Sequence, residues 1–403
     1  MTRHSISLGT LALLAACSGP DATRGGVRPG IEVLVSDSFH LLAGRRLGVL
    51  TNQTGVDRAG VSDVERLLST GAQVTAIFSP EHGYRGVLNR DSIGHGTDSA
   101  TGLPIYSLYG ATREPTAQML AGVDLLIIDL QDIGARPYTY ISTTLMAMRA
   151  AKRHSVGVMV LDRPNPIGGV HVEGPVLDTA YRSFVGMLPI PLRHGMTLGE
   201  LALLGDSLLG IDSAPVVIPV EGWSREQWFD QTSLPWVRPS PNMPDLESAT
   251  HYPGLVLFEG TNLSVGRGTP VAFQVVGAPW LDPPGVSDLM GAQAGVSLGD
   301  TNITPVDPSD GKYGGITIPA LRLRVTDRDL YRPTHVAVAL LAAIRARHLS
   351  TLDFREERFD RLAGGSGVRQ AILRGDPPAT IVAGWEEGLR AFGAVRRRFL
   401  LYR

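Results

Sequence analysis

The chain has 403 residues, a length that accommodates two domains, and its hydrophobic fraction of 43% is ordinary for a globular protein. Its 37 basic and 39 acidic residues almost cancel in charge. This balance excludes the polycationic surface with which proteins hold nucleic acid through its phosphate groups, so we expect no nucleic-acid partner.

The first 17 residues have the features of a secretory signal peptide. A short basic lead precedes an apolar run, residues 6–16, that is too short to span a bilayer as a mature helix. The run ends in Leu-Ala-Ala-Cys at Cys17, the only cysteine of the chain, and this tetrapeptide resembles the lipobox of bacterial lipoproteins. The resemblance implies lipidation of Cys17. A secretory signal that merely contains a cysteine is the alternative.

We therefore expect a lipoprotein of the cell envelope, attached to the membrane by its lipid alone. Residues 18–30 are rich in Gly, Pro, Ser and Asp and are predicted to form a flexible tether. No aspartate directly follows Cys17, as an inner-membrane retention signal would require, so we expect the outer membrane, facing the periplasm. The sequence carries no indication of oligomeric state.

Five apolar segments between residues 46 and 220 are predicted to be buried strands separated by helices. They are 46–50, 74–78, 123–128, 156–161 and 216–220, and a polar loop follows each. This alternation predicts an α/β fold with a Rossmann-like parallel sheet, whose polar loops share one edge. Residues 84–111 are interpreted as a long loop over that edge. The glycine fingerprints of nucleotide sites are missing, so we expect no cofactor.

Proline and glycine become frequent between residues 235 and 253, where we place a domain boundary. The first domain then covers 31–248, and a smaller C-terminal α+β domain covers 249–403. In the second domain the patterns predict strands at 255–258, 271–276 and 321–325, and helices at 334–348, 367–373 and 381–392. The first of these helices is expected to be capped by Thr334.

Residues suited to chemistry gather in the loops at the predicted sheet edge. Glu81 lies just beyond a predicted strand, where open α/β sheets bind their ligands, and Asp129 ends another strand. Glu259 lies in a glycine-rich segment of the second domain. Carboxylates, amides, aromatic rings and arginines in combination suit a sugar, because they transfer protons, bind hydroxyl groups and stack on the ring. The remaining candidates are Asn52, His82, Gln131, Arg136, Tyr138, Tyr140, Arg163, Asn165, His194, Asn242, Asn262 and Arg267.

Structural roles are the alternative for many of these residues. Asp129 and Asp162 are placed to cap the helices that follow them. Asp132 and Arg136 are spaced to form an ion pair, His194 suits a turn, and the two tyrosines suit packing. The histidines are dispersed and no thiolate accompanies them, so we expect no metal site.

Eight motifs follow one another along the chain. They are Ser79-Pro80-Glu81-His82-Gly83, Asp129-Leu130-Gln131-Asp132-Ile133-Gly134-Ala135-Arg136, Tyr138-Thr139-Tyr140, Asp162-Arg163-Pro164-Asn165-Pro166, Glu173-Gly174-Pro175, Arg193-His194-Gly195-Met196-Thr197, Pro241-Asn242-Met243-Pro244 and Glu259-Gly260-Thr261-Asn262. These motifs resemble those of the exo-acting β-N-acetylmuramidases, glycoside hydrolase family 171, formerly a domain of unknown function. The matching stretch runs from about Gly44 to Tyr402 and covers nearly all of the mature chain.

The resemblance implies a site in the cleft between a Rossmann-like domain and a smaller C-terminal domain. It implies removal of terminal β-linked N-acetylmuramic acid from the non-reducing end of peptidoglycan fragments, with Glu81 as the catalytic residue. We hypothesise that Glu81 is the general acid and that its partner is Asp129, or else Glu259, unless the acetamido group of the substrate takes that role. The candidates for binding the lactyl carboxylate of the substrate are Arg136, Arg163 and Arg267.

Two positions depart from the pattern of the family. Val265 and Gln274 stand at or near positions where the family commonly has a glutamate. If either missing carboxylate contributed to the reaction, the alternative function would be that of a non-catalytic, lipid-anchored protein that binds cell-wall fragments.

Overall fold

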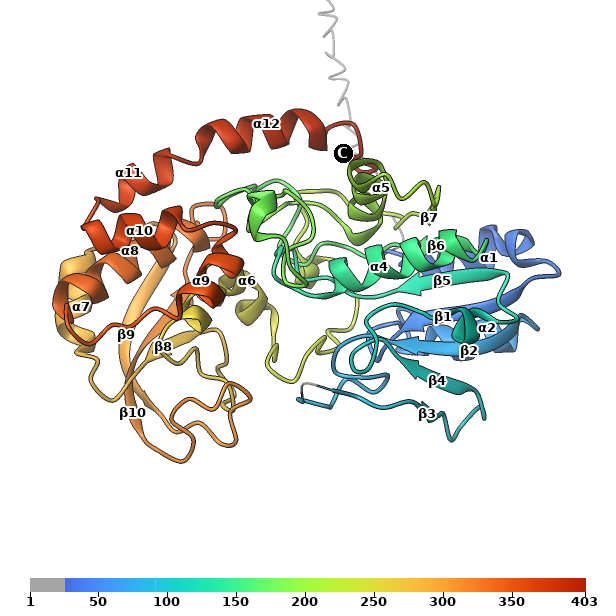
Figure 1. Cartoon of the computed structure of the whole chain (residues 1–403), viewed down its shortest axis with the longest axis horizontal. Helices are drawn as coiled ribbons and strands as arrows, with labels where there is room; N and C mark the ends of the chain where they lie inside the picture. The colour runs from blue at the N-terminus through green and yellow to red at the C-terminus, as the bar shows by residue number, and fades with distance from the viewer. Residues whose placement is uncertain (1–25, 91) are drawn as a thin grey trace, which may run out of the picture.

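The structure, a computed structural model, describes residues 26–90 and 92–403 (Figure 1). The predicted signal peptide, Cys17 and residues 18–25 of the predicted tether lie outside the described residues. Residues 26–30, predicted as the end of the tether, are docked on the first domain. Val27 is buried beside Trp223, and Arg28 and Glu221 exchange backbone hydrogen bonds of 2.9 and 3.0 Å. No helix within the described ranges is long and apolar enough to cross a membrane.

A seven-stranded sheet forms the centre of the first domain, in the order β3-β4-β2-β1-β5-β6-β7. Every neighbouring pair is parallel except β3 and β4. The strands are β1 (Arg46–Thr51), β2 (Gln73–Ser79), β3 (Gly96–Thr97), β4 (Pro104–Ser107), β5 (Leu125–Asp129), β6 (Gly157–Leu161) and β7 (Val216–Ile218). The predicted Rossmann-like parallel sheet is confirmed.

Two features of this sheet differ from the prediction. Residues 84–111 are not an uninterrupted loop, because β3 and β4 lie within them. These strands contain two and four residues, too few to show a recognisable period in the sequence. The last strand, β7, is an edge strand rather than a buried one, and its Val216 is 48% exposed.

Helices cover both faces of the sheet (Figure 1). On one face, α1 (Gly30–Asp37) and α2 (Asp63–Ser69) share a hydrophobic cluster with alternate residues of β1 and β5. On the other face, α4 (Tyr140–Arg153) and α5 (Leu198–Leu209) pack on the intervening strand residues. The short helices of this domain are η1 (Phe39–Leu42), α3 (Ala117–Leu120), η2 (Thr179–Tyr181) and η3 (Phe229–Gln231).

The second domain combines a three-stranded antiparallel sheet, in the order β8-β10-β9, with a set of helices. Its strands are β8 (Val275–Gly277), β9 (Val296–Ile303) and β10 (Ile318–Val325). Its helices are α6 (Leu246–Leu255), η4 (Val256–Gly260), α7 (Pro283–Met290), α8 (Pro333–Arg347), α9 (Glu356–Ala363), α10 (Gly367–Arg374), α11 (Pro378–Ala383) and α12 (Glu386–Arg396). The smaller α+β domain is confirmed.

Four local predictions for this domain differ from the structure. Of the strand predicted at 271–276, only residues 275 and 276 belong to a strand, β8. Residues 255–258 form no strand but end α6 and begin η4, because a fully buried apolar run has the same composition in a strand and in a helix. The helix predicted at 381–392 is divided at Gly384 into α11 and α12. Thr334 does not cap α8, because its hydroxyl donates a 2.9 Å hydrogen bond to Glu173 of the first domain.

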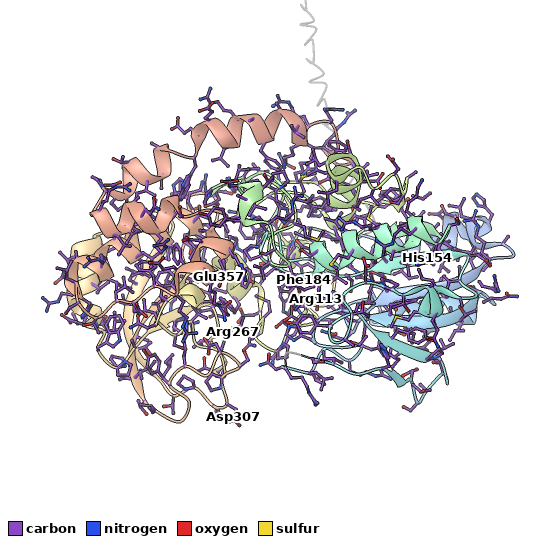
Figure 2. The ribbon with its side chains drawn as sticks, in the orientation of Figure 1. Arg113, His154, Phe184, Arg267, Asp307 and Glu357 are labelled. Carbon is purple, nitrogen blue, oxygen red and sulfur yellow. The ribbon has the colours of Figure 1, made fainter. Side chains whose placement is uncertain are left out.

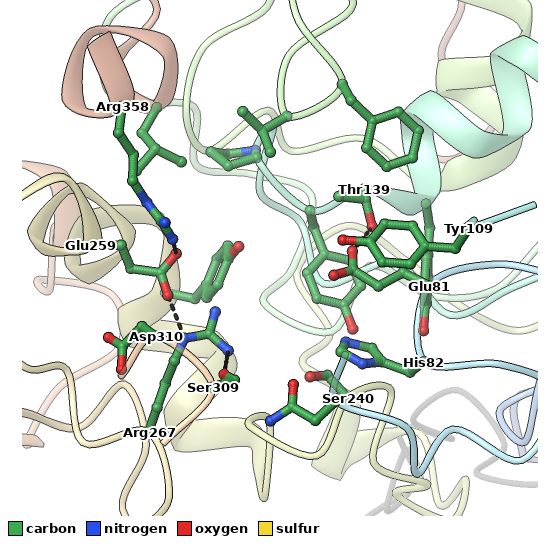
Figure 3. A pocket seen from close by; sticks show the side chains of 18 of the residues that line it. Glu81, His82, Tyr109, Thr139, Ser240, Glu259, Arg267, Ser309, Asp310 and Arg358 are labelled. Carbon is green, nitrogen blue, oxygen red and sulfur yellow. Dashed lines mark hydrogen bonds and ion pairs between the residues drawn. The ribbon is translucent and has the colours of Figure 1, made fainter. Parts of the chain in front are cut away.

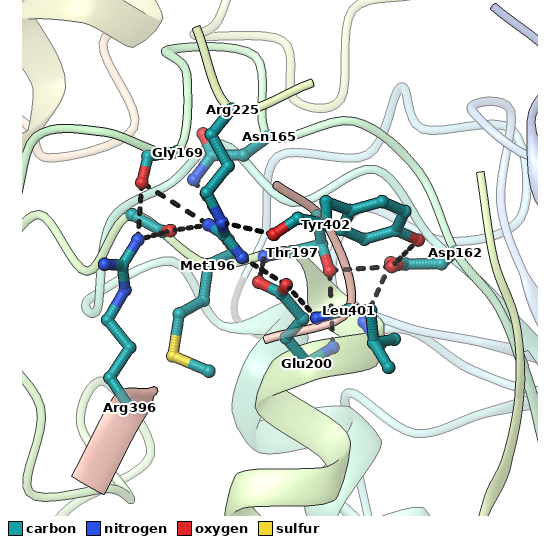
Figure 4. A network of polar contacts seen from close by, with 12 residues as sticks. Asp162, Asn165, Gly169, Met196, Thr197, Glu200, Arg225, Arg396, Leu401 and Tyr402 are labelled. Carbon is teal, nitrogen blue, oxygen red and sulfur yellow. Dashed lines mark hydrogen bonds and ion pairs between the residues drawn. The ribbon is translucent and has the colours of Figure 1, made fainter. Parts of the chain in front are cut away.

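The chain passes between the two domains at two places. The boundary predicted between residues 248 and 249 falls inside α6, so a continuous helix leads from one domain to the other. After α12 the C-terminus returns to the first domain, where the Tyr402 hydroxyl donates to Asp162 at 2.6 Å and Arg225 donates to the Tyr402 carbonyl at 3.0 Å (Figure 4). Asp162 also accepts the Gly199 N–H at the start of α5, and burial raises the pKa of Asp162 to about 6. The N-cap of α5 is Thr197, and Asp162 supports it by accepting the Thr197 hydroxyl at 2.7 Å, so the role of Asp162 is structural without its being the cap.

Candidate active site

A cleft of about 540 Å³ lies between the two domains (Figures 2 and 3). One wall belongs to the first domain and carries Glu81, His82 and Thr139, and the opposite wall carries Glu259 and Arg267 (Figure 3). The candidates from the sequence that line this cleft are Glu81, His82, Tyr138, Tyr140, Glu259 and Arg267.

Glu81 lies two residues beyond Ser79, the last residue of β2. Its Oε2 accepts a 2.6 Å hydrogen bond from the hydroxyl of Thr139, which precedes α4 (Figure 3). The loops that follow β2 and β5 thus meet at the sheet edge, and one loop orients the carboxylate that the other supplies. Oε1 of Glu81 accepts no hydrogen bond from the described residues, so this oxygen is available to a ligand.

His82 lies in the left-handed region with φ of 70°, and Gly83 follows with φ of 76°, so the chain turns sharply after Glu81. Nδ1 of His82 lies 2.9 Å from the Leu88 carbonyl oxygen, to which it donates a hydrogen. Burial lowers the pKa of His82, which keeps the ring neutral, and the neutral ring then presents Nε2 as an acceptor.

Glu259 is buried in the opposite wall and forms an ion pair with Arg267. Burial alone would raise the pKa of Glu259, but the charge and hydrogen bond of Arg267 outweigh it, and the pKa is lowered. The Arg358 guanidinium lies 3.7 Å from the same carboxylate. Arg267 also donates to the Ser309 hydroxyl at 3.3 Å and lies 5.0 Å from the ring centre of Phe273. Glu259 is therefore ionised, and Arg267 is held in place.

Asp129 and Arg163 do not line the cleft. Arg163 donates from Nε and Nη2 to the two carboxylate oxygens of Asp129, at 2.5 and 2.9 Å, and both side chains are buried. Asp63 is fully buried nearby, and burial together with the charge of Asp129 raises its pKa. The expectation that Asp129 faces Glu81 is corrected: Asp129 belongs to a buried ion pair at the sheet edge.

Arg136 is buried outside the cleft lining and contacts backbone instead of a carboxylate. It donates to the carbonyls of Pro175, Ile190 and Leu362 at 2.9, 2.8 and 2.8 Å. The ion pair considered with Asp132 does not form, and burial lowers the pKa of Arg136 to about 9. Because Leu362 lies near the end of α9, Arg136 ties this helix of the second domain to the first domain.

Most of the other polar candidates are hydrogen-bonded within the protein; the exception is Asn242, whose buried side-chain amide nitrogen has no partner among the described residues. Gln131 and Asn165 donate to backbone carbonyls, Asn52 donates to the Tyr140 hydroxyl at 2.7 Å, and the His194 ring accepts a backbone N–H. Those outside the cleft lining are Asn52, Gln131, Asn165, His194, Asn242 and Asn262. Among residues 26–90 and 92–403, no group of three or more His, Cys, Asp or Glu side chains is arranged to hold a metal ion.

Several cleft residues were not identified from the sequence. They include Tyr109, Arg113, Thr139, Phe184, Arg358 and Arg361. Thr139 lies between Tyr138 and Tyr140, two candidates from the sequence, so its position in this motif could have identified it as a site residue. The others lie in loops or on α9, where nothing in the local sequence distinguishes a cleft residue from an ordinary surface residue.

The two departures from the family pattern lie outside the cleft lining. Val265 is fully buried in the hydrophobic core. Gln274 donates to the two carboxylate oxygens of Asp245 at 2.8 and 3.0 Å and to the Ser248 hydroxyl at 2.7 Å. A glutamate in its place would set a second carboxylate against Asp245. These residues therefore affect packing beside the cleft rather than its lining.

Comparisons with known proteins agree with this architecture. The exo-β-N-acetylmuramidase NamZ family matches through its N-terminal domain at residues 47–247 and its C-terminal domain at residues 250–402. The peptidoglycan β-N-acetylmuramidase NamZ of Bacillus subtilis (strain 168) is 40% identical over 400 residues, covering 97% of this chain and 96% of that protein. Crystal structures of two DUF1343 family proteins from Bacteroides fragilis NCTC 9343 are each 32% identical and cover 94% of this chain, and 100% and 99% of their own, with TM-scores of 0.86 and 0.75. The chain belongs to the exo-β-N-acetylmuramidase NamZ family.

Proposed function

We propose that this protein is an exo-acting glycoside hydrolase that removes terminal β-linked N-acetylmuramic acid from the non-reducing end of peptidoglycan fragments. The observation that carries this proposal is the position of Glu81, which lies in the interdomain cleft, oriented by Thr139, across from the ionised Glu259. Membership of a family that includes a peptidoglycan β-N-acetylmuramidase supports the substrate class.

In the proposed mechanism, protonated Glu81 donates its proton to the glycosidic oxygen. The bond from that oxygen to the anomeric carbon breaks, and its electron pair goes to the oxygen, so that the shortened glycan leaves as an alcohol. One water molecule supplies the hydroxyl group gained by the anomeric carbon and the proton that restores Glu81. Glu259 contributes negative charge toward the positively charged, oxocarbenium-like transition state. The lowered pKa of Glu259 supports that role. Because Asp129 is held in a buried ion pair with Arg163, Glu259 is the remaining candidate for the carboxylate that acts together with Glu81.

A chromogenic β-N-acetylmuramide tests the activity directly, with the corresponding β-N-acetylglucosaminide as control. We expect release of the chromophore from the muramide and little from the glucosaminide. Saturable binding of the muramide without release would instead support a non-catalytic binding protein. The positions that motivated that alternative, Val265 and Gln274, are buried away from the cleft lining.

We also propose that Cys17 carries a lipid and anchors the protein to the outer membrane, facing the periplasm. The apolar run that ends in Leu-Ala-Ala-Cys supports this proposal. Substitution Cys17→Ser is expected to move the protein from the membrane fraction to the soluble fraction and to abolish incorporation of labelled palmitate, because the thiol that accepts the lipid is lost. A Cys17→Ser protein that still fractionates with membranes and incorporates the label would contradict lipidation at this residue.

A further inference from the structure

The arginines of the cleft differ in their partners. On the second domain, Arg267 and Arg358 both lie against Glu259, and Arg361 donates to Glu357 at 2.5 Å. Each of these three arginines therefore already has a carboxylate of the protein as a neighbour. An anionic substrate group gains less from an arginine whose charge is neutralised by a nearby carboxylate.

Arg113 lies on the opposite wall and has aromatic neighbours instead. Its guanidinium carbon is 4.0 Å from the ring centre of Phe184 and 5.1 Å from that of Tyr109. Figure 2 shows Arg113 and Phe184 together between the two domains. Within the described ranges, no carboxylate lies within ion-pair distance of Arg113. Stacking on the rings restrains the guanidinium plane, while its N–H groups remain free for a ligand.

We propose that Arg113 binds the lactyl carboxylate of the terminal N-acetylmuramic acid and so distinguishes this sugar from N-acetylglucosamine. This inference rests on the proposed function. The lactyl group is the chemical difference between the two sugars, and its carboxylate matches a guanidinium fork through two parallel hydrogen bonds. The candidates taken from the sequence fit less well, because Arg136 and Arg163 lie outside the cleft lining and Arg267 is paired with Glu259.

The test compares Arg113→Met and Arg113→Lys with the wild type on two chromogenic muramides. One carries the free lactyl carboxylate, and the other carries it as a neutral methylamide. We expect Arg113→Met to raise KM for the carboxylate substrate roughly 10- to 100-fold with little change in kcat, and to leave the amide substrate nearly unaffected. Arg113→Lys should be intermediate, because it keeps the charge without the fork. Arg390→Met, at an exposed position on α12, is the matched control.

Equal effects of Arg113→Met on both substrates, or no effect on either, would overturn the proposal. The same holds if Arg90→Met, which alters another arginine of the cleft, raises KM for the carboxylate substrate while Arg113→Met does not. If the wild type cleaves neither muramide, the proposed function fails. The role of Arg113 is then tested on its own, by measuring the affinity for free N-acetylmuramic acid by calorimetry. Weaker binding by Arg113→Met than by the wild type then supports it, and equal affinity overturns it.

Discussion

Replacing Glu81 with glutamine is expected to lower kcat on a muramyl-glucosamine disaccharide about 10²- to 10⁴-fold, the contribution typical of a general acid. Glutamine has the same shape as glutamate and can still accept the hydrogen bond from Thr139, so the fold and KM should change little. What is lost is the proton for the leaving oxygen. Steady-state kinetics on the disaccharide, with thermal unfolding as a check on folding, measures this effect.

The nature of the leaving group makes this test specific for the general acid. A nitrophenyl muramide has a leaving group that needs little protonation, so Glu81→Gln should lose much less activity on it than on the disaccharide. Glu387→Gln, an exposed substitution on α12, is the matched control and should leave both substrates unaffected. Near-full activity of Glu81→Gln on the disaccharide would show that Glu81 is not the catalytic residue.

The central strands of the first domain could be predicted because they are buried on both faces. In β5, for example, four consecutive apolar residues precede Asp129, and such a run stands out in the sequence. The same property misleads at residues 255–258, which are equally apolar and fully buried but helical. Short elements such as β3 escape prediction, because they are defined by pairing with a neighbour rather than by their own composition.

The position of Glu81 could also be predicted, because a residue directly after a parallel strand must lie at the carboxyl edge of the sheet. Which other edge residues face the cleft could not be predicted. Asp129 pairs outside the cleft with Arg163, which lies 34 positions along the chain. Arg136 donates to the carbonyl of Leu362, which lies 226 positions along the chain. Long-range partners of this kind decide whether a polar side chain binds substrate or holds the fold, and no local pattern encodes them.

Replacing Arg163 with methionine is expected to destabilise the protein by about 3–5 kcal/mol at pH 7, as removal of one partner of a buried ion pair typically does. Methionine keeps much of the volume but leaves Asp129 and Asp63 buried without the cation that lies against them. Urea denaturation measures the loss. The matched control is Arg153→Met, which breaks a partly exposed pair with Glu114 and should cost less than about 1 kcal/mol.

The dependence of this loss on pH follows from the direction of the pKa shifts. Burial raises the pKa of Asp63 and of Asp129 in the folded protein above their pKa in the unfolded chain. Protonation of these carboxyl groups therefore stabilises the fold. This stabilisation is complete at a pH below the pKa of the unfolded chain and is lost as the pH rises through the pKa of the folded protein. Removing Arg163 takes away a charge that opposes the shift of Asp129, and the folded pKa of Asp129 must rise further. The stability deficit of Arg163→Met should therefore shrink as the pH falls from 7 to 5.

The double variant Arg163→Met with Asp129→Asn separates a structural role from a catalytic one. It removes both members of the buried pair, so it should recover much of the stability lost in Arg163→Met and keep substantial kcat on the chromogenic muramide below its unfolding temperature. A double variant that is stable but inactive would indicate that Asp129 takes part in catalysis. A deficit in Arg163→Met that is independent of both pH and Asp129 would show that the lost contact to the Val56 carbonyl, and not the ion pair, determines the stability at this edge of the sheet.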